Sequence, residues 1–156
     1  MMREIEITRG GFTVFARVLG DPAAPALLYL QGGPGFPAPR QRFEWVSHAL
    51  ERGYQVVLLD QRGTGRSTRI DSATPELIRT DVLASLRADE IVADAEALRE
   101  EMGLDRWDVL GQSFGGFCLM HYLAAHPDSV GRALFTGGVP SIGEGADEVY
   151  RATFAK

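Results

Sequence analysis

The sequence predicts an α/β fold, in which helices flank a mostly parallel β-sheet. Short, continuously apolar runs at 26–31 and 54–60 are typical of strands that a parallel sheet buries on both faces. Segments with helical spacing lie between such runs, as in successive βαβ units. Turns rich in glycine follow Gln31 and Asp60 and surround Ser113. Because ligands bind beyond the carboxyl ends of parallel strands, these three turns predict one shared site.

A β-hairpin is expected at the start of the chain. Charged and apolar residues alternate over 3–8, which is typical of an edge strand, and 12–19 is its predicted partner across Gly10 and Gly11. The further strands are predicted at 26–31, 54–60, 107–112 and 130–136.

Apolar residues at helical spacing predict the helices between these strands. The first helix ends at Gly53 and the second at Gly103. Their apolar faces consist of Phe43, Val46 and Leu50 in the first helix, and Ile91, Ala95, Leu98 and Met102 in the second. A third helix is predicted at 115–126 and a last one from near Glu144, whereas 61–86 is expected to be mostly irregular.

The composition describes one globular domain or part of one. The chain has 156 residues, of which 45% are hydrophobic and 24% charged. A net charge of −5 provides no basic face, so we expect no nucleic-acid partner. No apolar run reaches the length of a membrane span, so we expect no membrane association. The single cysteine, Cys118, predicts a reducing, cytoplasmic location and a small core residue.

The motif over 111–116, Gly-Gln-Ser-Phe-Gly-Gly, predicts a nucleophile elbow. It follows an apolar strand and precedes an apolar helix, which is the context that makes this short pattern specific. The small residues allow a tight turn and let the helix pack close to the strand. We therefore assign Ser113 as the catalytic nucleophile, and Gln112 as a residue that shapes its site.

A serine nucleophile needs a histidine base and a carboxylate that orients the base. In the chain order expected for this elbow, an acid and then a histidine follow the serine. Only His121 and His126 follow Ser113, and no acid lies between Ser113 and His126. We expect His48 on the surface, His121 in the core and His126 at a helix end. We therefore expect the acid and the base to lie outside these residues. We also expect the isolated chain to be inactive.

A second glycine motif, Gly32-Gly33-Pro34-Gly35, follows the first buried strand. Acyl transfer requires backbone N–H groups that stabilise the developing oxyanion, and glycines let the main chain come close enough to donate. We assign Gly33 as the first donor, with Gly32 next, and the N–H of Phe114 as the second donor. Pro34 and Gly35 would shape the site; a plain Gly-Pro turn is the alternative.

A third motif lies over 60–67 and begins with Asp60-Gln61-Arg62. We expect Asp60 and Arg62 to pair and brace the turn; direct contact with substrate is the alternative. Gly63 and Gly65 permit positive φ angles. No Gly-Lys-Ser/Thr follows them, as a phosphate-binding loop would require, so no cofactor is expected. No group of residues has metal-ligand spacing, so no metal is expected either.

Together, the motifs at 32–35, 60–67 and 111–116 resemble those of the proline iminopeptidase family of α/β-hydrolases. The resemblance spans roughly residues 12–154. Many members carry histidine where this chain has Gln31, another residue that we expect to shape the site. The larger prolyl aminopeptidases have Gln-Gly-Gly-Pro-Gly there, and the stretch 87–92 also looks like that larger branch.

This resemblance implies the N-terminal part of an α/β-hydrolase fold and a serine exopeptidase that releases N-terminal proline from peptides. It also implies that late loops supply the acid and histidine, and that a helical cap follows the strand 130–136. We expect a partial core at 1–140 and the start of the cap at 141–156. The apolar strand 130–136 would then need the missing C-terminal portion, a partner chain or self-association to cover its edge.

Two alternatives remain. One is a carboxylesterase-type acyl hydrolase on the same scaffold; Ser113 argues against dehalogenases and epoxide hydrolases, which use an aspartate nucleophile. The other is a truncated, non-catalytic fragment or binding module that keeps the elbow without the rest of the triad.

Overall fold

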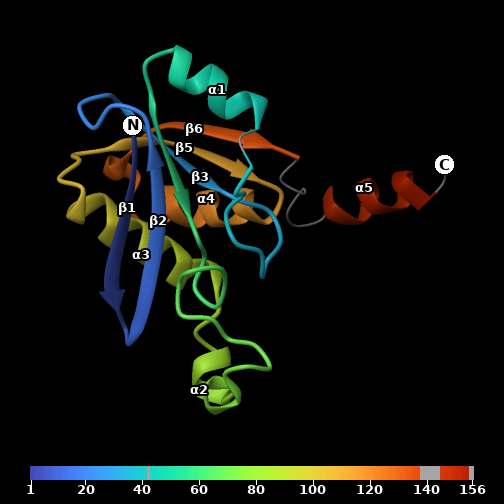
Figure 1. Cartoon of the computed structure of the whole chain (residues 1–156). Coiled ribbons are helices and arrows are strands. Elements are labelled where there is room, and N and C mark those ends of the chain that lie inside the picture. The colour runs from blue at the N-terminus through green and yellow to red at the C-terminus, as the bar shows by residue number, and fades with distance from the viewer. Residues whose placement is uncertain (42, 138–144, 155–156) are drawn as a thin grey trace.

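A computed structural model describes residues 1–41, 43–137 and 145–154. Its centre is a six-stranded sheet with the order β1-β2-β4-β3-β5-β6 (Figure 1). The strands are β1 (Met2–Arg9), β2 (Phe12–Leu19), β3 (Ala26–Leu30), β4 (Gln55–Leu59), β5 (Trp107–Gln112) and β6 (Val130–Thr136). The helices are α1 (Glu44–Glu51), α2 (Thr80–Leu83), α3 (Ala88–Glu101), α4 (Phe114–Ala125) and α5 (Gly145–Phe154). The predicted α/β architecture is confirmed.

The sheet is antiparallel at one end and parallel over the rest. β1 pairs with β2 from Met2 opposite Leu19 to Arg9 opposite Phe12, so the predicted hairpin is confirmed. β2 pairs antiparallel with β4, and the pairs β3–β4, β3–β5 and β5–β6 are all parallel. The carboxyl ends of four parallel strands therefore share one edge of the sheet.

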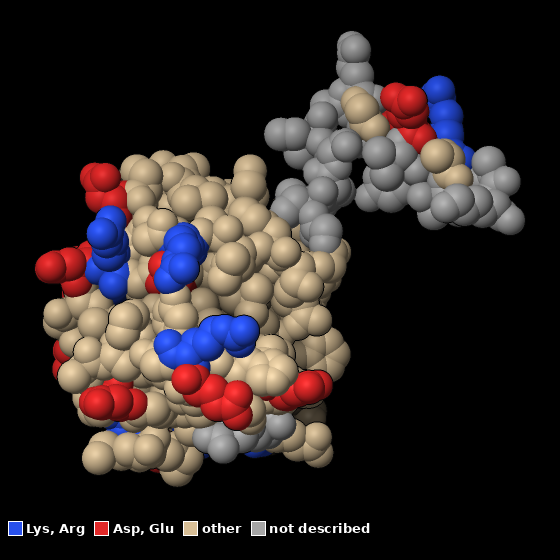
Figure 2. All heavy atoms as spheres, turned by 90° about the horizontal axis from the view of Figure 1, so that it is seen from above, with Lys and Arg blue, Asp and Glu red and all other residues tan. Residues whose placement is uncertain are grey.

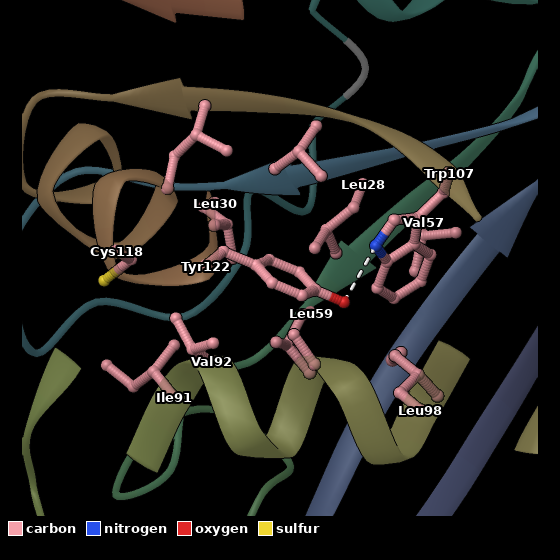
Figure 3. Packing of buried hydrophobic residues seen from close by; sticks show 14 of the residues in the cluster. Leu28, Leu30, Val57, Leu59, Ile91, Val92, Leu98, Trp107, Cys118 and Tyr122 are labelled. Atoms are coloured by element: carbon pink, nitrogen blue, oxygen red, sulfur yellow. Dashed lines mark hydrogen bonds between the residues drawn. The ribbon is translucent and has the colours of Figure 1, made fainter. Parts of the chain in front are cut away.

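Two hydrophobic layers sandwich the sheet (Figure 1). α3 and α4 pack against one face, where Leu28 and Leu30 belong to the larger core cluster. α1 covers part of the other face, where Tyr29 joins a smaller cluster. Alternate residues of β3 thus face opposite layers, and all five are buried because both layers are apolar. Figure 3 shows the larger cluster, including a hydrogen bond of 3.0 Å from Trp107 Nε1 to the Tyr122 hydroxyl.

Helix α4 corrects one prediction. Its buried face is formed by Cys118, Leu119 and Tyr122, which follow one another at helical spacing. His121 is exposed, so its predicted place in the core is wrong. Phe43 is a smaller departure, because it precedes α1 and is exposed, and Val46 is the buried residue of that helix.

Among the described strands, β6 lies at one edge of the sheet, as predicted. Leu134 and Phe135 are 46% and 41% exposed there, although both are apolar. Figure 1 shows α5 standing apart from the sheet beyond β6. The predicted boundary at 140/141 falls in 138–144, outside the described residues.

The surface seen from above is mixed in charge. Figure 2 shows acidic and basic side chains gathered together on one part of this face, whereas the part toward α5 carries few charges. Within the described ranges, no helix combines the length and apolar character that crossing a membrane requires.

Candidate active site

Ser113 stands at a sharp turn between β5 and α4. Its φ and ψ angles are +50° and −117°, and it is the one non-glycine residue with a positive φ in the described part of the chain. The Ser113 N–H donates to the carbonyl of Thr136 at 3.0 Å, and the Ser113 carbonyl accepts from the N–H of Gly116 at 2.8 Å. These bonds hold a strained backbone in place and leave the serine exposed.

Glycine is required on both sides of this turn. A Cβ on Gly111 would lie 2.6 Å from the Gly115 carbonyl oxygen, and a Cβ on Gly115 would overlap the carbonyl oxygen of Leu30. The helix therefore starts in direct contact with β3 and β5, and the close packing predicted from the small residues is confirmed.

The glycine loop, which we define as residues 32–37, borders Ser113. A Cβ on Gly32 would lie 3.2 Å from Ser113 Cβ and 3.8 Å from Ser113 Oγ. Gly33 adopts a φ of +128° and precedes a cis peptide bond to Pro34. Phe114 begins α4, so its N–H is one of those that a helix leaves without an intrahelical acceptor. Two of the predicted oxyanion donors, Gly32 and Phe114, thus adjoin the serine, and Gly33 follows Gly32 in the loop; their role stays a prediction.

Gln112 lies beside a cavity on the α1 face of the sheet. The cavity measures about 360 Å³ and is lined by Tyr29, Phe43, Trp45, Leu110, Gln112 and Thr136. The Tyr29 hydroxyl donates to Gln112 Oε1. Burial raises the pKa of Tyr29, which keeps its hydroxyl a neutral donor. Gln112 is thereby tied to the α1 face, next to the nucleophile.

A second cavity, of about 280 Å³, brings together three of the predicted site-shaping residues. Pro34 and Gly35 line it from the glycine loop, and Arg62 lines it from the turn after β4. Ile70, Leu86 and Ile91 complete the apolar part of the wall. The irregular segment after β4 therefore contributes to the surroundings of the glycine loop.

Asp60 and Arg62 do not pair with each other, so that prediction is wrong. Asp60 is fully buried; it accepts from the N–H groups of Ala38 at 2.9 Å and Arg66 at 2.8 Å, and it pairs with Arg40 at 2.5 Å. It therefore joins the glycine-loop side of the site to the turn after β4.

Arg62 turns instead toward α3. Its Nε and Nη2 contact the two carboxylate oxygens of Asp94 at 2.7 and 2.6 Å, and its guanidinium lies 4.7 Å from the centre of the Phe12 ring. Sequence reasoning missed Asp94. The sequence did contain a signal for it. Asp94 lies three residues after Ile91, on the apolar face of the predicted helix, and a buried carboxylate requires a cation as its partner.

None of the described histidines is hydrogen-bonded to Ser113. At about 1.5 Å rise per residue, His121 and His126 lie about 12 and 20 Å along α4 from the serine. His48 is a half-exposed residue of α1, 4.0 Å from Glu44, as expected for a surface histidine. His126 ends α4 as predicted, with Nδ1 3.9 Å from Glu96. The described residues therefore present a serine and its surroundings without a base in reach, and they include no cluster of three or more potential metal ligands.

Comparison with known proteins agrees with this geometry. A family model described as the alpha/beta hydrolase fold matches residues 25–156. The chain belongs to the α/β hydrolase fold family. The mostly parallel sheet, the flanking helices and the elbow are the N-terminal part of that hydrolase fold, as the motifs predicted.

The relatives of this hydrolase chain include proline iminopeptidases. The one from Aeromonas sobria is 48% identical over 98% of this chain, and the chain spans 37% of that protein's length. Among solved structures, a proline iminopeptidase-related protein of Thermus thermophilus is 27% identical, with a TM-score of 0.64; the match covers 86% of this chain and 44% of the other. Epoxide hydrolase A of Mycobacterium thermoresistibile has a TM-score of 0.69 at 18% identity, over all of this chain and 46% of the other, and shares the hydrolase fold alone.

Proposed function

We propose that this chain is the N-terminal, nucleophile-bearing portion of a serine peptidase that releases N-terminal proline from peptides. The observation that carries the proposal is the strained turn at Ser113, which lies against Gly32 in a chain similar to proline iminopeptidases. The full activity requires the part of the protein that corresponds to the remaining length of these relatives.

In the proposed reaction, Ser113 Oγ attacks the carbonyl carbon of the N-terminal proline. The N–H groups of Gly33 or Gly32 and of Phe114 stabilise the oxyanion of the tetrahedral intermediate. A histidine from the C-terminal portion takes the serine proton and passes it to the departing peptide amine. Water then attacks the prolyl ester and releases free proline, which restores the Ser113 hydroxyl.

Substrate preference separates the peptidase from the esterase alternative. The protein that includes the C-terminal portion should hydrolyse proline p-nitroanilide with a higher kcat/KM than p-nitrophenyl acetate. Ser113→Ala should lose both activities and fold normally, because the side chain is exposed. A preference for the ester would contradict the peptidase and favour a carboxylesterase.

One observation favours a non-catalytic role for the chain by itself, namely that no described histidine is bonded to Ser113. A fluorophosphonate probe tests this directly. The isolated chain should label at Ser113 no faster than a surface serine, whereas the complete protein should label rapidly. Rapid labelling of the isolated chain would show an activated serine and contradict the assignment of the base to the C-terminal portion.

Two further parts of the proposal concern the rest of the molecule. We infer that α5 begins the helical cap, which its place after the last described strand supports. We also keep the prediction of a reducing, cytoplasmic location. The support for it is that Cys118 is the single cysteine of the sequence and is buried as a free thiol.

A further inference from the structure

Gln31 joins the glycine loop to the sheet. It lies directly after β3, and only 4% of the residue is exposed. Its Nε2 donates to the carbonyl of Leu59 at 3.0 Å and to the carbonyl of Phe36 at 3.1 Å. Leu59 ends β4, and Phe36 lies near the far end of the loop. A single amide group therefore sets the distance between the loop and the edge of the sheet.

The backbone of Gln31 is also held on two sides. Gln61 Nε2 donates to the Gln31 carbonyl at 3.2 Å. The same carbonyl oxygen would lie 3.0 Å from a Cβ on Gly115, at the start of α4. The residue that starts the loop therefore lies in contact with the turn after β4 and close to the helix that follows Ser113.

No backbone–backbone hydrogen bond joins residues 32–37 to another described residue. Gly33 and Gly35 both have positive φ angles, a region that glycine adopts without steric cost. The residue between them, Pro34, has no N–H to donate. Beyond the loop, the next anchor is the hydrogen bond from Ala38 to Asp60. The bond from Gln31 to Phe36 is therefore the link that closes the loop on itself.

One hydrogen-bonding group of Gln31 has no partner, which is not expected for a residue with a purely structural role. Its Oε1 is buried and has no hydrogen-bond partner among the described residues. Leaving a buried acceptor unpaired costs stability. Gln55, at the other end of β4, provides the contrast. It is also fully buried, but its Nε2 donates to Pro22 and Ala24 at 3.0 and 2.7 Å, and its Oε1 accepts from Arg3 at 2.7 Å.

We propose that Gln31 is a positioning residue for the reaction of Ser113. Its two N–H donors fix the curvature of the glycine loop and so place the N–H groups of Gly32 and Gly33 where the oxyanion forms. The inference rests on the function proposed above, because it assigns those donors to acyl transfer. Oxyanion donors act by being held in place before the charge develops, and a misplacement of about 1 Å can cost about 10²-fold in rate.

The first test measures the loop in the protein that includes the C-terminal portion, and it needs no activity. Backbone ¹⁵N relaxation should give order parameters for Gly32, Gly33 and Gly35 near the ~0.85 of rigid backbone in the wild type. In Gln31→Leu, and in the isosteric Gln31→Glu, which replaces the donors by acceptors, they should fall below ~0.6. Gln55→Leu is the matched control and should leave them unchanged. A loop that is mobile in the wild type, or equally rigid in Gln31→Leu, overturns the inference whatever Ser113 does.

The second test uses the protein that includes the C-terminal portion. Gln31→Leu should lower kcat for proline p-nitroanilide by about 10- to 100-fold and leave KM within about twofold, because the loss concerns the oxyanion. Gln55→Leu should keep kcat within about twofold, yet lower the urea midpoint more than Gln31→Leu does. Equal kcat losses in the two variants would mean a structural role and overturn the inference. If the wild type does not turn over the anilide, the proposed function fails, and the order parameters still decide the role of Gln31.

Discussion

Gly115 lies so close to the carbonyl oxygen of Leu30 that a side chain at 115 would overlap it. The oxygen belongs to the last residue of β3, and the glycine to the first turn of α4. Two elements far apart in the sequence thus meet without an intervening side chain. The position of Ser113 depends on this contact, because the helix that follows the serine cannot move away from the strand or toward it.

Gly115→Ala should destabilise the fold by at least about 3 kcal/mol, because the clash is with backbone and cannot be relieved by a rotamer change. Gly103→Ala is the control: a Cβ there meets nothing within 4 Å, and only its φ of +66° opposes the change, at about 1–2 kcal/mol. Urea unfolding followed by tryptophan fluorescence measures both. Equal midpoints for the two variants would contradict the close contact.

Glu96 should make stability depend on acid pH. Burial opposes its ionisation, but hydrogen bonds from Arg99, Tyr122 and Ser129 outweigh this and lower the pKa of Glu96 from 4.5 to about 2. The folded state therefore binds this proton less readily than the unfolded state, so the stabilisation is complete above about pH 4.5 and is lost as the pH falls toward 2. The contribution is at most of the order of 3 kcal/mol, because solvent screens part of these interactions. Urea titrations between pH 7 and 3 should show a steeper loss for the wild type than for Glu96→Gln.

The pair between Arg62 and Asp94 should couple strongly, because both side chains are almost fully buried. Either Arg62→Met or Asp94→Leu alone should cost up to about 3–5 kcal/mol, since each leaves a buried charge with only its longer contact, from Asp94 to Arg9 at 3.1 Å or from Arg62 to Glu90 at 3.3 Å. The double variant should be more stable than the sum of the single losses predicts. A double-mutant cycle in urea measures the coupling, and additive losses would mean that the charges do not interact in solution.

Because His121 is exposed, we expect its substitution to have little effect on stability. His121→Ala should change the free energy of unfolding by less than about 0.5 kcal/mol. Its neighbour provides the comparison: Tyr122→Phe removes the hydroxyl that accepts from Trp107 and donates to Glu96, and should cost about 1–3 kcal/mol. If His121→Ala were as costly as Tyr122→Phe, the histidine would belong in the core as the sequence suggested.

The open edge at β6 should make the isolated chain self-associate. An apolar edge strand with unpaired backbone groups is a template for another strand. Sedimentation velocity at ~100 μM should show species larger than a monomer, and Phe135→Lys should reduce them, because a charge disfavours edge pairing. A chain that stays monomeric over this range would show that the edge needs no cover.

The strands were predictable because their signals are local. Alternation and Gly10-Gly11 give the hairpin, and the bounds of β5 and β6 follow from apolar runs that end at turn residues. The elbow was equally predictable, because its glycines and serine are adjacent in the sequence.

The partners of charged residues were not predictable, because they come from distant elements. Asp60 and Arg62 are neighbours in the sequence, yet their side chains leave the turn in different directions, toward Arg40 and toward Asp94. Which face of α4 is buried could not be predicted, for another reason. Apolar residues such as Phe117 and Met120 occupy its exposed side as well, so periodicity could not show where His121 points.

The hydrogen bond from Ser113 to Thr136 makes the last described strand part of the elbow. A cut in the polypeptide just after this strand would leave the nucleophile's turn intact in the first piece. If the base and the acid reside in the second piece, neither piece works alone, and hydrolysis returns only when the two meet. In that case, dividing the protein just after β6 would give two complementing halves whose hydrolysis of substrate reports that they have met.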